Sequence, residues 1–142
     1  MIKTKFAISG SLLAVLLMFV SGCASTVKVY DGPRLPANKL STLQPDFTAK
    51  SHLSEINIRR INGKRVSDAI NPEYKVLPGL HTLNVELHKP GGSRSAVAAS
   101  HAINNVSFTA QPGHDYRVLG EIKDGIGIVW VEDKASGQKV SR

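Results

Sequence analysis

The chain has 142 residues, a formal charge of +7 and a single cysteine. This length favours one domain, which can bury roughly two-thirds of the surface that its unfolded chain exposes, so folding requires no metal or disulfide. The lone cysteine excludes an intrachain disulfide. The basic residues carry no aromatic interleaving and no nucleic-acid motif, which excludes a nucleic-acid partner from our expectations.

The first 23 residues have the three-part pattern of an export signal. Lys3 and Lys5 precede an apolar run over residues 6–19, which is shorter than the roughly 20 residues of a membrane-spanning helix. The run leads into Val20-Ser21-Gly22-Cys23, where small residues precede the cysteine. We therefore interpret residues 1–22 as a secretory signal peptide.

Val20-Ser21-Gly22-Cys23 resembles the lipobox of bacterial lipoproteins. The resemblance implies a diacylglycerol on the Cys23 sulfur, cleavage before Cys23, and acylation of the new amine by a chain such as palmitate. Two or three acyl chains hold a protein stably on a membrane. Because Ala24 stands where an Asp would favour retention at the inner membrane, the resemblance also implies the outer membrane, on its periplasmic face. The alternative is an uncleaved anchor with an incidental cysteine.

The segment after the cysteine has the composition of a linker. Gly32, Pro33, Pro36 and Pro45 lie among polar residues, and such residues punctuate regular structure. We predict a lipidated N-terminus and tether over residues 23–50, with a short strand at 27–30. Residues 36–43 fit either a helical turn or a loop.

From residue 51 to residue 142 the pattern is typical of a β domain. Short β-type runs separated by turn residues predict strands over 53–61, 64–66, 74–77, 80–88, 103–110, 116–122, 126–132 and 138–141, with 96–99 ambiguous between strand and helix. Asn62-Gly63 is a strong hairpin signal, because both residues tolerate positive φ. Pro78-Gly79 and Pro112-Gly113 favour tight turns, and we interpret them as two similar hairpins in one sheet.

These runs predict a mostly β fold, namely a small antiparallel sandwich of seven or eight strands in the manner of immunoglobulin or transthyretin domains. Residues 126–132 are apolar on both faces, which favours a central strand. The predicted core consists of Ile56, Ile58, Leu83, Val85, Val106, Phe108, Val118, Ile128 and Trp130.

Residues 56–88 resemble the small sandwich modules called PEGA domains. The shared features are the Ile-Asn-Ile strand at 56–58, the Asn62-Gly63 turn, and the Pro78-Gly79 hairpin with its alternating strand. The Pro-Glu-Gly-Ala motif itself is absent. The resemblance implies a non-catalytic module of a bacterial surface or envelope protein and supplies no ligand.

No residue pattern indicates catalysis, a metal or a cofactor. The five histidines lack a metal-ligand spacing, and His81 shares strand parity with Leu83, which favours a packing role. Asp124-Gly125 reads as a turn, because a calcium loop needs further acidic ligands. Trp130 could offer a stacking platform for a sugar, although its apolar neighbours favour the core. We expect no enzyme activity and no cofactor.

The basic residues gather at one place, at Arg59, Arg60, Lys64 and Arg65. They predict either contact with an anionic partner, such as lipopolysaccharide, a lipid head group or an acidic glycan, or a solvated strand edge that resists pairing. Three hypotheses follow. The first is a non-catalytic binding or structural module that contacts envelope proteins or peptidoglycan. The second is a binder of an anionic glycan or lipid, and the third is a cryptic envelope hydrolase.

Overall fold

A computed structural model describes residues 25–46, 55–66, 69, 71–89 and 101–142. Its strands are β1 (Ser25–Lys28), β2 (Ser41–Pro45), β3 (Glu55–Ile61), β4 (Lys64–Arg65), β5 (Pro72–Val76), β6 (Gly79–His88), β7 (His101–Ala110), β8 (Asp115–Lys123) and β9 (Ile126–Asp133). A single 3-10 turn, η1 (Ala37–Lys39), precedes β2. No helix within these ranges has the length and apolarity needed to cross a bilayer.

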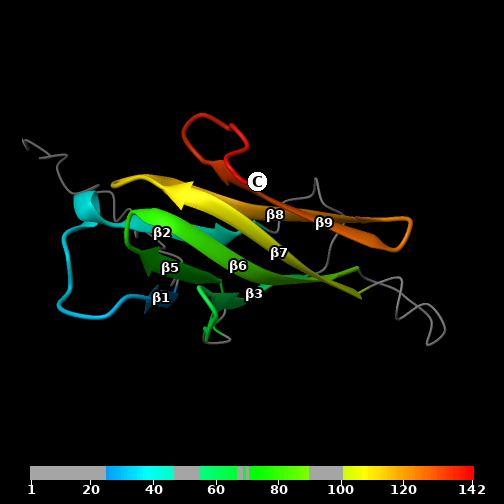
Figure 1. Cartoon of the computed structure of the whole chain (residues 1–142), viewed down its shortest axis with the longest axis horizontal. Helices are drawn as coiled ribbons and strands as arrows, with labels where there is room; N and C mark the ends of the chain where they lie inside the picture. The colour runs from blue at the N-terminus through cyan, green and yellow to red at the C-terminus, as the bar shows by residue number, and fades with distance from the viewer. Residues whose placement is uncertain (1–24, 47–54, 67–68, 70, 90–100) are drawn as a thin grey trace, which may run out of the picture.

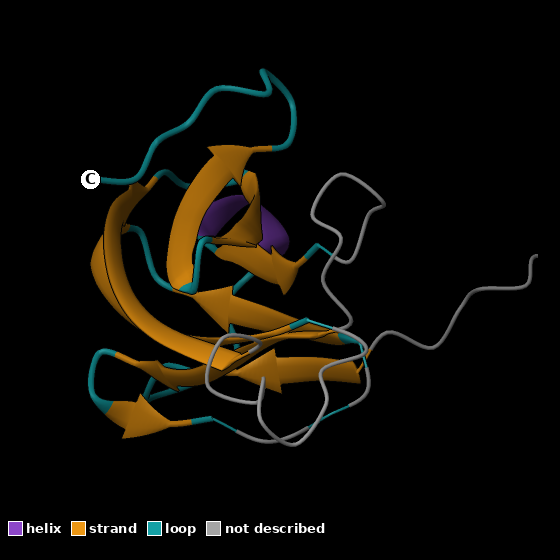
Figure 2. Cartoon of the chain, turned by 90° about the vertical axis from the view of Figure 1, so that its right-hand side faces the viewer, coloured by secondary structure: helices purple, strands orange, loops and turns teal. Residues whose placement is uncertain are grey.

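The strands form two sheets, in the orders β1-β5-β2-β8-β9 and β4-β3-β6-β7. Figures 1 and 2 show them as two twisted layers around a shared core. The predicted mostly β sandwich is confirmed. It differs from a purely antiparallel one, because β1 pairs with β5 and β2 with β8 in parallel. The described residues form nine strands, and the segment after β9 contributes only isolated bridges at Lys139 and Ser141.

A tether was predicted over residues 23–50, and for residues 25–46, the described part of this range, the prediction is wrong. β2 lies in the interior of the five-stranded sheet, between β5 and β8, and its Leu43 is 0% exposed. Pro36 and Pro45 are accommodated at the start of η1 and at the end of β2. The sandwich therefore includes residues on both sides of the predicted domain boundary at residue 51, because β1 and β2 share a sheet with β5, β8 and β9.

The two Pro-Gly turns were expected to be hairpins in one sheet, and this is also wrong. Pro78 and Gly79 lead from β5 of one sheet into β6 of the other, and Pro112 and Gly113 return from β7 to β8. Gly79 pairs with Ala110, so both corners lie at the same end of the sandwich. Proline and glycine define the local backbone bend, but they do not decide which strand becomes the partner.

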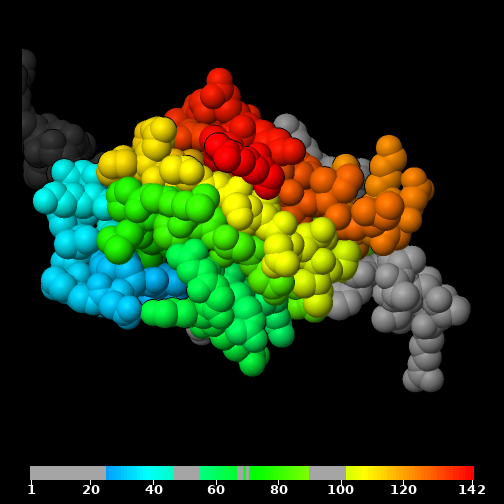
Figure 3. Space-filling model, viewed as in Figure 1, coloured from blue at the N-terminus to red at the C-terminus, as the bar shows by residue number. Residues whose placement is uncertain are grey.

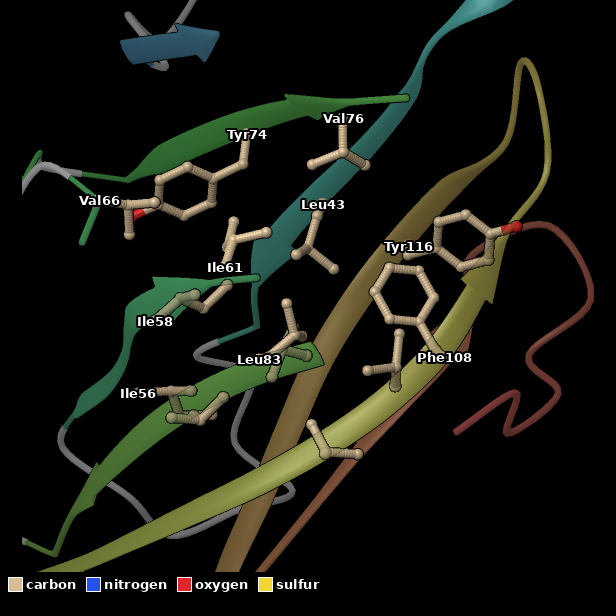
Figure 4. Packing of buried hydrophobic residues seen from close by; sticks show 14 of the residues in the cluster. Leu43, Ile56, Ile58, Ile61, Val66, Tyr74, Val76, Leu83, Phe108 and Tyr116 are labelled. Atoms are coloured by element: carbon tan, nitrogen blue, oxygen red, sulfur yellow. The ribbon is translucent and has the colours of Figure 1, made fainter. Parts of the chain in front are cut away.

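Seven of the nine predicted core residues are buried, since Ile56, Ile58, Leu83, Val85, Val106, Phe108 and Val118 are at most 4% exposed. Tyr74, Tyr116 and Leu43 also belong to the core, and the Tyr116 and Phe108 rings meet edge to face (Figure 4).

The predictions for Ile128 and Trp130 are wrong, because β9 is an edge strand and not a central one. Its inward residues are Val129 and Val131, whereas Ile128 is 41% exposed. Trp130 lies directly opposite Leu119 on the outer face of the sheet. The second apolar stripe of this strand therefore belongs to an outward-facing cluster and not to the core.

The core narrows from the Tyr116 end towards the β8–β9 turn. A Cβ added at Gly120 would lie 2.6 Å from Leu87 Cδ2, and one at Gly127 would lie 2.5 Å from the Ala102 Cβ. The two sheets can approach this closely only because neither glycine has a side chain. Towards the Tyr116 end, the C-terminal segment bridges the layers, since Val140 N–H donates to the Val131 carbonyl and Arg142 N–H to the Ser107 carbonyl.

Candidate functional site

The basic cluster lies on the β3–β4 hairpin. Asn62 and Gly63 form its two-residue turn with φ of 52° and 79°, as the sequence predicts. The register of β3 against β6 shifts between Ile58 and Arg60, which is a β-bulge at Arg59. Since Ile58 and Ile61 both face the core, the bulge turns two consecutive arginines towards the outer face.

The structure pairs these cations with different partners. Arg59 Nε lies 3.2 Å from a Glu86 carboxylate oxygen, and Lys64 Nζ lies 3.1 Å from Asp31 of the loop after β1. Arg60 donates to the Gly63 carbonyl. The four basic residues thus share one hairpin but not one direction, because Lys64 reaches towards the other sheet.

Arg60 and Arg65 occupy directly opposite positions of the hairpin, and both side chains are exposed. Residues opposite each other across an antiparallel pair lie on the same face, with Cβ atoms about 5 Å apart. This pair concentrates positive charge at the edge of the four-stranded sheet. Anion binding through the hairpin stays a prediction.

His81 is a packing residue, as its strand parity predicts. It is 7% exposed, and its ring lies 5.8 Å from that of Phe108. Its Nε2–H donates to the Leu77 carbonyl at 2.6 Å, while its Nδ1 accepts from the Asn62 amide at 2.9 Å. Both ring nitrogens are therefore used in holding the Asn62 turn against the Leu77 corner.

A second site, which the sequence did not predict, surrounds His114. An open depression of about 350 Å³ is lined by Gly113, His114, Asp115, Lys134 and Ala135. His114 Nδ1–H donates to Asp133 at 2.5 Å, so the histidine of the depression is bonded to one carboxylate, and Asp115 is the acidic residue that lines the depression beside it. The sequence signal that could have revealed this site is the Asp124-Gly125 turn. Counting residues outwards from the turn along β8 and β9 places Asp133 opposite Tyr116, two residues from His114.

The hydrogen bond from His114 holds the pKa of Asp133 below its ordinary value, against the opposing effect of burial. The N–H groups of Ala135 and Ser136 donate to the other carboxylate oxygen of Asp133. This carboxylate therefore caps the turn after β9 as well as orienting the imidazole. The five lining residues include an imidazole, a carboxylate and an amine, but no hydroxyl or thiol.

The outer face of the five-stranded sheet carries a network of polar side chains beside Trp130. Arg117 bonds Glu132 at 2.8 Å and lies 3.5 Å from Asp46. Glu132 also accepts from the Trp130 indole N–H at 2.9 Å. The indole is thus fixed on the surface by hydrogen bonding and by Leu119 opposite it. This geometry agrees with the surface alternative for Trp130 and not with the core one.

Cys23 lies outside the described residues. Asp124 and Gly125 form a two-residue turn with positive φ, as predicted. Across the described ranges no group of three or more His, Cys, Asp or Glu side chains is arranged to hold a metal ion.

Comparison with known proteins gave no relative. No family model, no curated protein and no solved structure matches the chain.

Proposed function

We propose that this protein is a lipid-anchored, non-catalytic binding or structural module of the cell envelope, held on the periplasmic face of the outer membrane through Cys23. The observation that carries the proposal is the sequence Val20-Ser21-Gly22-Cys23 at the end of a signal-like segment.

The binding surface in this proposal is the outer face of the five-stranded sheet around Trp130. An aromatic ring with a polar end suits interfaces, because it supplies contact area and a fixed hydrogen-bonding group together. The neighbouring Arg117–Glu132 pair offers donors and acceptors that are already held in place. Envelope proteins and peptidoglycan are the partner classes that this surface suits.

Two experiments test the proposal. Metabolic labelling with a fatty-acid probe should mark the wild-type protein and should not mark Cys23→Ser. An unlabelled wild-type protein that keeps its leader by mass spectrometry would overturn the anchor. A photo-crosslinking residue at Trp130 should capture an envelope component in intact cells, whereas one at Leu80, which is 71% exposed on the other sheet, should not.

A second candidate function is binding of an anionic glycan or lipid head group through the β3–β4 hairpin. The opposed Arg60 and Arg65 side chains favour it. Retention on immobilised lipopolysaccharide should fall as salt rises, because exposed charge contacts are screened. Retention that does not depend on salt would count against this function.

The third hypothesis, a cryptic envelope hydrolase, is favoured by the depression at His114. In this reading His114 would act as a general base on water while Asp133 orients it. Peptidoglycan turnover by the purified protein, lost in His114→Ala, would replace the non-catalytic proposal. Equal absence of turnover in both proteins would remove the hydrolase.

A further inference from the structure

The covalent path from the anchor to the folded domain is very short. Ser25 is the first residue of β1 and pairs with Pro72 of β5. Two residues of extended chain span at most about 7 Å. A lipid on Cys23 would therefore hold the sandwich against the bilayer, within the Debye length of about 8 Å over which surface charges act at physiological salt.

The side of the sandwich that meets the bilayer follows from the topology. β1 and β4 are the terminal strands of the two sheets. The ion pair between Lys64 and Asp31 joins the β4 hairpin to the loop after β1, and Figure 3 shows these segments next to each other. The opposite terminal strands, β7 and β9, are bridged by the C-terminal segment. The side with β1 and β4 is thus the one nearest the anchor.

This side is rich in positive charge. Its basic residues, called the basic edge from here on, are Lys28, Arg34, Arg60, Lys64 and Arg65, all of them exposed. Asp31 is the acidic residue of the adjoining loop, and it is itself exposed. The Lys28 ammonium lies 4.7 Å from the centroid of the Tyr30 ring. A cation beside an aromatic ring with a polar hydroxyl is a combination suited to a membrane interface.

We propose that the basic edge binds the phosphodiester head groups of acidic phospholipids in the membrane that carries the anchor, so that the sandwich lies with β1 and β4 on the bilayer. The anchor sets the distance, and the charges set the orientation. This inference rests on the proposed lipid anchor and adds the surface that faces the membrane. The face around Trp130 belongs to β8 and β9, at the other end of the five-stranded sheet from β1.

Footprinting of the acylated protein tests the orientation directly. The protein is placed on vesicles of phosphatidylcholine, alone or mixed with phosphatidylglycerol, and its lysines are modified with an amine reagent. Modification of Lys28 and Lys64 should fall several-fold on the mixed vesicles. Modification of Lys123, exposed at the far β8–β9 turn, should not change. Equal modification of all three lysines on both vesicles would overturn the orientation.

A charge-matched pair of variants tests the head-group contact. Each Lys or Arg near an anionic surface is worth roughly a fivefold change in binding. In the mature chain carrying Cys23→Ser, Arg60→Gln with Arg65→Gln should weaken co-sedimentation with mixed vesicles by about twenty-five-fold, on the same principle. Lys123→Gln with Lys139→Gln removes the same charge and should change it less than about twofold. Equal losses in the two variants would overturn the inference.

Failure of the anchor and failure of the basic edge give different results. If the protein takes up the fatty-acid probe but shows no preference for phosphatidylglycerol, the proposed anchor stands and the proposed role of the basic edge is wrong. If the protein does not take up the probe, both the anchor and the membrane-facing role of the basic edge are wrong. Circular dichroism of each variant confirms that the sandwich has folded.

Discussion

The close approach of the two sheets at Gly120 should make this position intolerant of even one added methyl group. A Cβ there would lie 2.6 Å from Leu87 Cδ2, 3.0 Å from Leu87 Cδ1 and 3.2 Å from the Ile128 carbonyl oxygen. Carbon atoms in contact prefer about 3.5–4.0 Å. Leu87 would therefore have to withdraw by about 1 Å to reach an ordinary contact distance, although it is 0% exposed and enclosed on all sides.

Overpacking of this kind destabilises the folded state by about 1–3 kcal/mol. Replacing Gly by Ala also lowers the conformational entropy of the unfolded chain, which stabilises the protein by about 0.4–1 kcal/mol. We expect Gly120→Ala to lower the free energy of unfolding by about 1–2 kcal/mol, measured by urea unfolding in a Cys23→Ser background.

Leu87→Ala alone should cost about 2–5 kcal/mol, because it leaves a cavity. The double variant should cost less than the two single costs added together, by about 0.5–3 kcal/mol, since the new methyl group occupies part of that cavity. Additive losses, or a Gly120→Ala variant as stable as wild type, would refute the proposed contact between the sheets at this point.

Three further predictions concern the turns and the titratable groups. Gly63→Ala, at φ 79°, should lower the free energy of unfolding by about 1 kcal/mol. Asn62→Ala should also destabilise, because the Asn62 side-chain oxygen accepts a hydrogen bond from the Thr82 N–H of β6; denaturant midpoints measure both. The pKa of Asp133 is lowered in the folded state, so its contribution to stability should be present above its unfolded pKa and lost as pH falls towards the folded one. Asp133→Asn and His114→Ala should both reduce this loss of stability in acid. An unchanged loss in either variant would contradict the role given to the His114–Asp133 hydrogen bond. Burial raises the pKa of the Tyr116 phenol, so stability should be full below about pH 10 and fall above it; Tyr116→Phe should remove that alkaline loss in a pH series of urea midpoints.

The local features of the chain could be predicted from the sequence because their causes are local. Asn62 and Gly63 form their turn because both residues accept positive φ. The alternation of Leu83 and Val85 with polar residues identified the buried face of β6. His81 follows from the same parity. In each case the residues that determine the feature lie within a few positions of it.

The pairings between distant segments could not be predicted in this way. β2 looks like part of a linker, because its prolines and polar residues give no alternation, yet its Leu43 is enclosed by β5 and β8 on either side. Burial supplied by strands 30 or more residues away leaves no local mark. The hydrogen bond between His114 and Asp133 depends in the same way on the register of β8 against β9. The Asp124-Gly125 turn is evident from the sequence, but the hydrogen bond between these two side chains is not.

The terminal strands on the two sides of the sandwich are protected from pairing with other chains in different ways. At β7 and β9 the C-terminal segment supplies backbone partners, since Asp133 N–H donates to the Gln138 carbonyl and Val140 N–H to the Val131 carbonyl. At β1 and β4 the strands are short and carry lysine or arginine, which discourages pairing with another chain. Protection by charge leaves a cationic surface beside the residue proposed to carry the lipid, whereas protection by backbone pairing leaves no such surface. Solubility alone would be served by acidic residues at these edges as well. An acidic edge would repel an anionic membrane surface held about 7 Å away, whereas a basic edge is compatible with both requirements.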